Sequence, residues 1–378
     1  MPKTYDVDGN ADRDIEPLYT FQEILQQPLL WPTTLDRVRA ASEQLNLADR
    51  LKHARVLLTG AGTSAYAAAS IAAAWPRTAA VPTTDLLVDP ERYLVEVDVV
   101  ISLARSGNSP ESAAVVERVR TVRPQILQLA ITCNEESALS QSGLDGLIVL
   151  DPRTNDRSLV MTSSFSNLVL AGLALAQPDA VASTTGPACR QAETLLPSID
   201  ASCKRIAGGV RDRVVVLASS PLQGWRCEAG LKLLEMTAGR FPLVTEGFLG
   251  LRHGPMSFVT ADTLVLCLLS SDPVRRLYET DLVRELRAKK LGRLAGIVDA
   301  AERNDAEAEE LFDDLIPAVV PQMRDDLRTP FEIVIPQLLG YHLSLRIGLN
   351  PDSPSPDGII NRVVQGVRLH SALSPVRR

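Results

Sequence analysis

The first half of the chain alternates short apolar runs with longer amphipathic stretches, and glycine- and serine-rich loops separate them. Apolar runs bounded by turn residues predict buried strands, whereas apolar positions spaced three and four apart predict helices. Strands are predicted at 54–59, 97–103, 125–132 and 146–150, with helices after the first two and again at about 162–176. Such alternation is typical of a parallel, doubly wound sheet.

The same pattern of strand, serine-rich loop and helix returns in the second half. Strands are predicted at 213–218, 263–269, 291–298 and 316–320, and a long apolar helix at 331–349. Two copies of one pattern indicate two similar α/β domains that arose by internal duplication.

The domain boundaries follow from this repeat, with a linker around a short helix expected at 178–200. We predict an N-terminal extension with helices, a first domain, a second domain and a C-terminal closing segment, at residues 1–45, 46–185, 205–349 and 350–378.

Composition excludes several classes of function. The chain has 39 basic and 46 acidic side chains, a formal charge of −7, and no basic stripe, which argues against a nucleic acid partner. Its five cysteines are scattered without C-x-x-C spacing, so we expect a reducing compartment and neither a disulfide framework nor a metal site. The first residues are too polar for a signal peptide, and the apolar stretches are too short or too polar to cross a membrane. A cytoplasmic protein without membrane contact is expected.

A charged stripe marks the otherwise apolar helix that follows the strand at 213–218. Glu228, Lys232 and Glu235 are spaced i, i+4 and i+7, so they share one helix face. Arg252 and His253 follow on a loop bounded by glycine and proline. The stripe could be a solvated ion pair, but its apolar neighbours favour a polar cavity. A carboxylate held by a lysine, with a histidine available, can move protons on and off carbon and oxygen.

Two loops of the first half lie where a strand ends and a helix begins. At such places free backbone N–H groups and the helix dipole favour an anion. Thr63, Ser64, Ser106 and Ser109 supply hydroxyl donors there. Simple helix capping would explain one such loop. Two consecutive loops at neighbouring strand ends favour a binding crevice.

A dinucleotide site is the rival interpretation of the first loop. Gly60-x-Gly62-x-x-Ala65 matches the fingerprint G-x-G-x-x-G/A, with Asp85 behind it. A nicotinamide-dependent oxidoreductase would use this fragment, but it leaves the second loop and the charged stripe without a role.

Motifs along nearly the whole chain resemble the sugar isomerase (SIS) domain family, and within it the AgaS-type sugar-phosphate isomerases and deaminases. They are L-L-T-G-A-G-T-S-A, V-P-T-T-D-L, A-R-S-G-N-S-P-E-S, I-T-C-N-E, M-T-S-S, L-K-L-L-E-M-T-A-G, R-H-G-P and N-R-V-V-Q-G-V. More distantly, the chain is similar to the isomerase half of glucosamine-6-phosphate synthase. The resemblance implies two SIS domains, each a mostly parallel sheet in a three-layer αβα arrangement, and a hexose 6-phosphate bound between loops.

The resemblance also implies site residues. Glu235 matches the base that moves a proton between C1 and C2, and His253 matches the ring-opening histidine, which in the family can come from a neighbouring subunit. Glu228 and Lys232 match orienting or sugar-contacting positions. The candidate substrate-binding residues are Gly62, Thr63, Ser64, Arg105, Ser106, Gly107, Asn108, Ser109, Arg252 and Gln365.

The chain departs from the synthase pattern in four respects. Ala104-Arg105 stands where the synthase has Ser-Gln, and Gln365 aligns with a lysine, which argues against a Schiff base there. The glutamine-hydrolysing domain has no counterpart. In the second domain the loop 218–221 lacks the usual glycines, which argues against a second phosphate site in that loop.

We therefore expect a phosphosugar aldose–ketose isomerase of amino sugar metabolism, of the tagatose-6-phosphate or galactosamine-6-phosphate type, with or without release of ammonia. No metal or redox cofactor is required. A homodimer or homotetramer is expected, because the helix at 331–349 and the loop of His253 both suit a subunit interface. The alternatives are a non-catalytic sugar-phosphate-binding regulator and the oxidoreductase.

Overall fold

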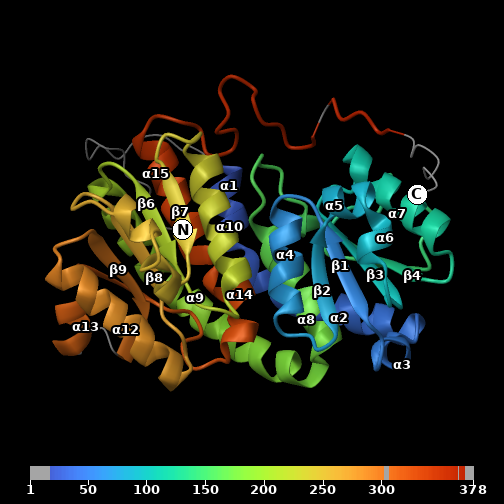
Figure 1. Cartoon of the computed structure of the whole chain (residues 1–378), viewed down its shortest axis with the longest axis horizontal. Coiled ribbons are helices and arrows are strands. Elements are labelled where there is room, and N and C mark those ends of the chain that lie inside the picture. The colour runs from blue at the N-terminus through green and yellow to red at the C-terminus, as the bar shows by residue number, and fades with distance from the viewer. Residues whose placement is uncertain (1–17, 302–305, 365, 371–378) are drawn as a thin grey trace.

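The computed structural model describes residues 18–301, 306–364 and 366–370. It contains two five-stranded parallel sheets side by side (Figure 1). The first sheet has the order β2-β1-β3-β4-β5 and the second β7-β6-β8-β9-β10, so the two sheets share one topology. The strands are β1 (Val56–Gly60), β2 (Thr78–Pro82), β3 (Val99–Ala104), β4 (Leu127–Thr132), β5 (Gly146–Val149), β6 (Val214–Leu217), β7 (Leu243–Glu246), β8 (Leu264–Leu268), β9 (Arg293–Val298) and β10 (Asp314–Pro317). The predicted α/β class and its internal repeat are confirmed.

Helices cover both faces of both sheets. The first half has α1 (Tyr19–Leu25), α2 (Gln27–Gln44), α3 (Leu47–Leu51), α4 (Thr63–Ala72), α5 (Thr83–Val88), α6 (Pro90–Tyr93), α7 (Pro110–Val122) and α8 (Ser163–Ala176). The second half has α9 (Pro178–Gly209), α10 (Gln223–Met236), α11 (Phe248–Leu251), α12 (Pro273–Ala288), α13 (Ala306–Leu311), α14 (Asp325–Glu332) and α15 (Val334–Arg346).

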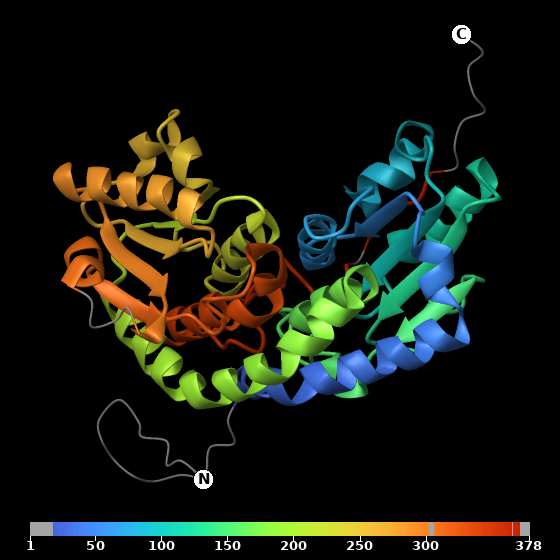
Figure 2. The same cartoon turned by 90° about the horizontal axis from the view of Figure 1, so that it is seen from below.

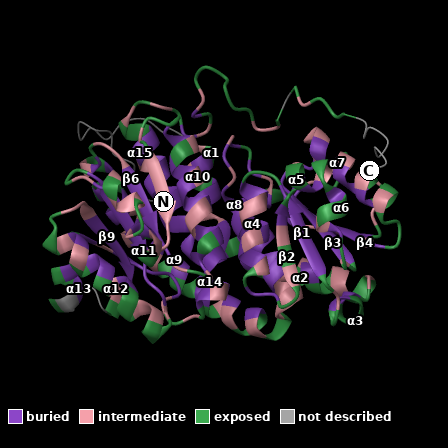
Figure 3. Cartoon of the chain, in the orientation of Figure 1, coloured by how far each residue is buried: buried purple, intermediate pink, exposed green. Residues whose placement is uncertain are grey.

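Alternate residues of each central strand belong to different apolar cores. In β6, Val214 and Val216 pack into a large core shared by both domains, whereas Val215 and Leu217 pack into a separate core with α11 and α12. In the first sheet, Leu57 and Val100 face α5 and α7. Buried residues accordingly line the strands and the inner sides of the helices (Figure 3).

A single long helix replaces the linker expected at 178–200. Helix α9 spans 32 residues and contains Pro187 and Pro197. It packs against α2 and α8 of the first half and against α15 and β10 of the second, and Figure 2 shows it running along one side of both domains. The linker prediction was wrong, because burial of one apolar face against both domains sustains a continuous helix here.

Two smaller features also differ from the sequence prediction. Strands β2 and β7 were missed because they are short and almost none of their residues is buried. The helix expected at 331–349 is two helices, α14 and α15, which join at Ile333. Over its described residues, the segment 359–370 forms no helix. Over the described residues, no helix combines the length and apolarity that a membrane crossing requires.

Candidate functional site at the junction of the two domains

The first candidate loop connects β1 to α4 through a tight turn. Gly62 precedes the helix with φ +55°, a left-handed conformation that favours glycine. A side chain at Gly60 would place its Cβ 2.6 Å from the backbone carbonyl carbon of Ser64, so this position also needs glycine. The turn brings Thr63 and Ser64 to the first positions of α4, where both are buried. The N–H groups of Ser64 and Ala65 are bonded within the turn, to the carbonyls of Ala61 at 3.1 Å and Gly62 at 2.9 Å.

The second candidate loop connects β3 to α7 beside the first, because β1 and β3 are neighbouring strands. Gly107 has φ +63°, and a Cβ there would lie 2.4 Å from Ser137 Oγ. The Asn108 side chain fixes the loop from outside, since its Oδ1 accepts a hydrogen bond from the Ala138 N–H at 3.0 Å. Pro110 starts the helix.

Helix capping does not explain the hydroxyls of these loops. Ser109 is the N-cap residue of α7, yet it makes no capping hydrogen bond with its side chain and instead lies 2.7 Å from the Ser112 hydroxyl. Ser64 and Ser106 are not N-cap residues at all. The two loops thus carry hydroxyl groups that local helix structure does not require.

The charged stripe of α10 lies where this helix packs against α4 of the first domain. Lys232 Nζ is 3.5 Å from Glu228 Oε1 and forms a closer ion pair with Glu235. Glu228 and Lys232 are fully buried, whereas the Glu235 side chain is 23% exposed. Thr63 Oγ1 donates to Glu228 Oε1 at 3.3 Å, which joins the first candidate loop to the stripe. Sequence spacing predicted the stripe, and the structure adds this bridge.

Close packing of the two helices depends on a glycine. A Cβ on Gly224 of α10 would lie 2.7 Å from the backbone N of Ser70 in α4. The two domains therefore meet at a helix crossing without room for a side chain at this position.

Burial sets the charges of the stripe. It raises the pKa of Glu228 to about 8, although Lys232 opposes the shift, and Glu235 adds to it. Burial alone would lower the pKa of Lys232, but the two glutamates raise it instead. At neutral pH we expect a protonated Glu228 beside a Lys232 ammonium that pairs with the Glu235 carboxylate. Glu228 Oε2 has no hydrogen-bond partner among the described residues. A bound ligand could therefore supply one.

Arg105 secures the C-terminal segment beside the second loop. Its guanidinium is buried and donates to the backbone carbonyls of Ser158 at 3.3 Å, Leu159 at 2.9 Å and Arg362 at 2.6 Å. Arg362 in turn donates to the carbonyl of Asp156 at 2.6 and 2.9 Å. These contacts use Arg105 as an anchor for the chain that crosses the molecule in Figure 1. Gln365, the next candidate on that chain, lies outside the described residues.

Arg252 and His253 are not brought to the stripe within one chain. They follow α11, whose apolar side belongs to the core on the opposite face of the second sheet from α10. Arg252 Nε pairs with Glu285 of α12 at 2.6 Å, and its Nη2 with Asp281 at 2.9 Å. His253 is exposed to solvent.

Tyr66 is a site residue that sequence reasoning missed. Burial raises the pKa of its phenol, and the nearby Cys227, Glu228 and Glu235 raise it further, so the ring lies beside the stripe. Its spacing of i+3 from Thr63 on α4 was the available signal.

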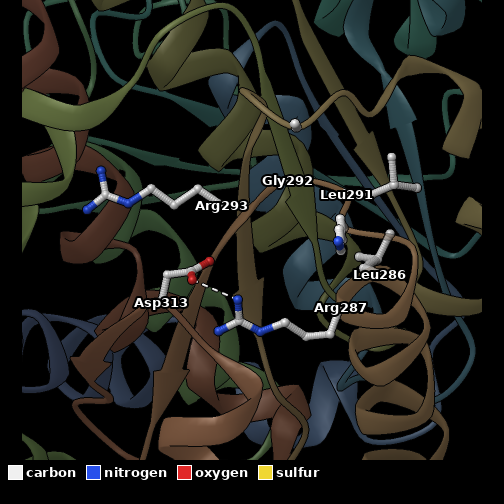
Figure 4. Close-up of a pocket in the computed structure, with 8 residues that line it drawn as sticks. Leu286, Arg287, Leu291, Gly292, Arg293 and Asp313 are labelled. Carbon is white, nitrogen blue, oxygen red and sulfur yellow. Dashed lines mark hydrogen bonds and ion pairs between the residues drawn. The ribbon is translucent and has the colours of Figure 1, made fainter.

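A pocket of about 410 Å³ lies at the amino ends of the strands of the second sheet (Figure 4). It does not fit a substrate site. It lies at the start of β9, whereas ligands of parallel sheets bind at the carboxyl ends of the strands. Its arginines are engaged, since Arg287 pairs with Asp313 at 2.7 Å and Arg293 with Asp314 at 2.7 Å.

Comparison with known proteins agrees with the two-sheet architecture. The sequence profile of the SIS domain matches residues 51–177. A relative from Escherichia coli O157:H7, D-galactosamine-6-phosphate deaminase AgaS, is 36% identical over 93% of this chain and 95% of its own length. The AgaS protein of Streptomyces coelicolor is also 36% identical, over 98% of both chains. The chain belongs to the AgaS family of SIS-domain proteins.

Solved structures of this family have the same fold. Tagatose-6-phosphate ketose/aldose isomerase from Escherichia coli superposes with a TM-score of 0.84 at 31% identity, covering 96% of this chain and 99% of that one. The C-terminal domain of glucosamine-fructose-6-phosphate aminotransferase from Francisella tularensis shares the fold at a TM-score of 0.72 and 18% identity, covering 91% and 100%. The AgaS resemblance expected from the motifs is thus confirmed.

Proposed function

We propose that this AgaS-family chain is a phosphosugar isomerase that interconverts aldose and ketose 6-phosphates and releases ammonia when C2 of the sugar carries an amine. Its relatives are named for a galactosamine-6-phosphate deaminase and a tagatose-6-phosphate isomerase. The observation that carries the proposal is the position of the stripe. A partly exposed Glu235, paired with a buried lysine, lies on the helix that meets the first candidate loop.

The phosphate group is assigned to the two loops of the first domain. Ser64 at the start of α4 and Ser106 and Ser109 before α7 donate hydroxyl hydrogen bonds, and Thr63 lies beside them. Gly62, Gly107 and Asn108 give the loops their shape. Short polar donors at the start of two helices are the arrangement that binds phosphate elsewhere in α/β proteins.

The chemistry needs one base that reaches two neighbouring carbons. After ring opening, the Glu235 carboxylate takes the proton from C2. The electrons of that bond form a C1–C2 double bond while the π electrons of the C1 carbonyl move to O1, which takes up a proton, giving an enediol or enolamine. Return of the proton to C1, with loss of a proton from the C2 hydroxyl or amine, gives a C2 carbonyl from a hydroxyl sugar or a C2 imine from an amino sugar. Water then adds to the imine, and the ketose and ammonia leave. Lys232 holds Glu235 in place through their ion pair, while the neutral Glu228 offers its unpartnered oxygen to a sugar hydroxyl.

Ring opening is assigned to His253 of a second copy of the chain, since His253 lies on the far face of its own second sheet. A homodimer or homotetramer would satisfy this requirement. Mixing an inactive Glu235→Gln protein with an inactive His253→Ala protein should then restore activity, because mixed assemblies contain one intact site. Absence of any recovery after subunit exchange would contradict the shared site.

Two more residues belong to the proposal. Arg252 would orient the His253 loop through its ion pairs with α12, and Gln365 is proposed as a substrate-binding residue. The domain boundaries at 46–185 and 205–349 remain a proposal, as does a cytoplasmic location, which suits the five free cysteines.

A substrate panel tests the function. Hexose and hexosamine 6-phosphates are assayed for both ketose and ammonia, with the unphosphorylated sugars as controls. We expect turnover only of phosphorylated substrates, with ammonia from the amino sugars. Stoichiometric binding without exchange of solvent deuterium into C1 or C2 would favour a non-catalytic regulator instead.

A further inference from the structure

The loop after β8 is the counterpart, in the second sheet, of the loop after β3 in the first. Strand β3 lies between β1 and β4, and β8 lies between β6 and β9. Each of the two strands leads through a short polar loop into a helix that starts with proline, Pro110 in α7 and Pro273 in α12. An anion site built by this topology is therefore expected twice.

In the second domain this place is filled by the carboxylate of Asp325. Ser270 donates its hydroxyl to Oδ2, and Ser271 donates to Oδ1 through both its N–H at 2.9 Å and its hydroxyl at 3.0 Å. Two guanidinium groups complete the set, Arg275 at 2.7 Å from Oδ2 and Arg328 at 3.2 Å from Oδ1. Asp325 is 4% exposed and Ser270 is fully buried.

These five donors are the kind that recognise phosphate. Two hydroxyls, one backbone N–H near a helix start and two arginines surround a single anionic group. We infer that the loop 269–273, with Arg275 and Arg328, is a second anion-binding site that the chain occupies with its own Asp325 carboxylate. The AgaS chain then binds phosphate groups through its first domain alone.

In the first domain, the side chain that joins the loop to the segment after the last strand comes from the loop itself. There Arg105 of the loop reaches the backbone carbonyls of Ser158 and Leu159, in the segment after β5. In the second domain, the joining side chain is Asp325, which lies in the segment after β10 and accepts hydrogen bonds from the loop. None of the described carboxylates accepts a hydrogen bond from residues 105–109, so that loop is left for an external anion.

The filled site has a structural consequence. Asp325 is the first residue of α14, and α14 packs against α8 of the first domain and against α10. The carboxylate therefore fixes α14 to the loop after β8, and α14 in turn packs against helices of both domains where the domains meet.

Solvent can reach the site once the carboxylate is removed. A pocket of about 630 Å³ is lined by Ser271, Arg275 and Asp325 among others. The neighbouring Glu279 accepts a hydrogen bond from the Ser270 N–H at 2.7 Å, and burial raises its pKa to about 7. Low pH favours its neutral form, which does not repel an added anion.

The test is an Asp325→Ala variant of the whole chain, titrated with inorganic phosphate at pH 6. Asp326→Ala is the matched control, because Asp326 lines the same pocket but pairs with Arg324 outside the site. We expect Asp325→Ala to melt about 6–10 °C lower, to bind one more phosphate per chain than wild type or the control, and to regain melting temperature with phosphate or formate. A phosphate count equal to wild type, with no more thermal rescue than the control shows, would overturn the inference.

A second variant covers the case in which Asp325→Ala does not fold. Asp325→Asn keeps the size and removes the charge. The surrounding donors lower the pKa of Asp325 despite its burial, so the charge stabilises wild type at neutral pH and this contribution is lost as the carboxylate is protonated below pH ~4. The difference in melting temperature between wild type and Asp325→Asn should therefore shrink below pH ~4. The other carboxyl groups near these arginines, Asp272, Glu279 and Glu332, are common to both proteins. A difference independent of pH would show that the donors do not recognise an anion.

Discussion

The two domains share one topology but treat the same loop differently. After β3, the loop around Ser106 presents hydroxyls with no carboxylate from the chain among its described partners. After β8, the loop around Ser271 is closed on Asp325. The difference teaches that duplication of a fold need not duplicate a binding site, because one carboxylate from a neighbouring segment suffices to occupy it.

The two helices that follow the central strands also differ. Helix α4 contributes hydroxyls at its first turn, whereas α10 contributes carboxylates and an ammonium along its length. The Thr63–Glu228 hydrogen bond joins the two sets. In our proposal, anion recognition belongs to the first domain and proton transfer to the second, and the site exists only where the domains meet.

The largest effect is expected on turnover, from loss of the base that the second domain contributes. Glu235→Gln removes the base while keeping the size of the side chain, so turnover should fall by roughly 10²–10⁴-fold while the binding of substrate remains close to that of wild type. Steady-state kinetics and calorimetric titration measure the two quantities separately. Full turnover in this variant would remove α10 from the chemistry.

One serine from each of the two loops after β3 and β8 gives a comparison for the next largest effect. Ser106→Ala should weaken the binding of a hexose 6-phosphate about 10–150-fold, because a charge-assisted hydrogen bond of about 1.5–3 kcal/mol is lost. Ser271→Ala should instead lower the melting temperature and leave affinity unchanged, because its hydroxyl binds Asp325. Equal effects of the two changes on affinity would break the comparison between the domains.

The helix crossing that joins the domains should be sensitive to one methyl group. Gly224→Ala places its Cβ against the α4 backbone, and overpacking of this kind costs about 1–3 kcal/mol of stability. Gly208→Ala in α9 is the control, since a Cβ there meets no atom within 4 Å. Denaturant unfolding of both variants measures the difference. A Gly224→Ala protein as stable as the control would show that the helices can separate without cost.

The last prediction concerns the pH dependence of stability, which the buried glutamate sets. The pKa of Glu228 is raised to about 8, whereas a glutamate in the unfolded chain ionises near pH ~4.3. The folded state therefore holds this proton longer, and stability declines as pH rises from ~4.3 to about 8, by at most about 1.4 kcal/mol per pH unit. Glu228→Gln should flatten this decline. Melting temperatures from pH 5 to 8 check it, and parallel profiles for the two proteins would contradict the pKa shift.

Sequence patterns predicted the central strands and the charged stripe, but not how distant segments of the chain pack together. Apolar runs such as 97–103 and the spacing of Glu228, Lys232 and Glu235 are local signals, so they could be read directly. The course of α9 could not, because its stability comes from packing against both domains rather than from its proline-containing sequence. The contacts of Arg105 with Arg362 and of Ser271 with Asp325 join residues 257 and 54 positions apart. No local pattern reports such pairs.

A crystal structure of the protein with a six-carbon sugar-alcohol 6-phosphate would test most directly how the two domains divide the work. We predict the phosphate at the loops of Ser64 and Ser106, and the C1–C2 end of the ligand within about 2.6–3.2 Å of the Glu235 carboxylate. A phosphate bound at the loop of Ser271, or a sugar chain that runs away from α10, would contradict the division.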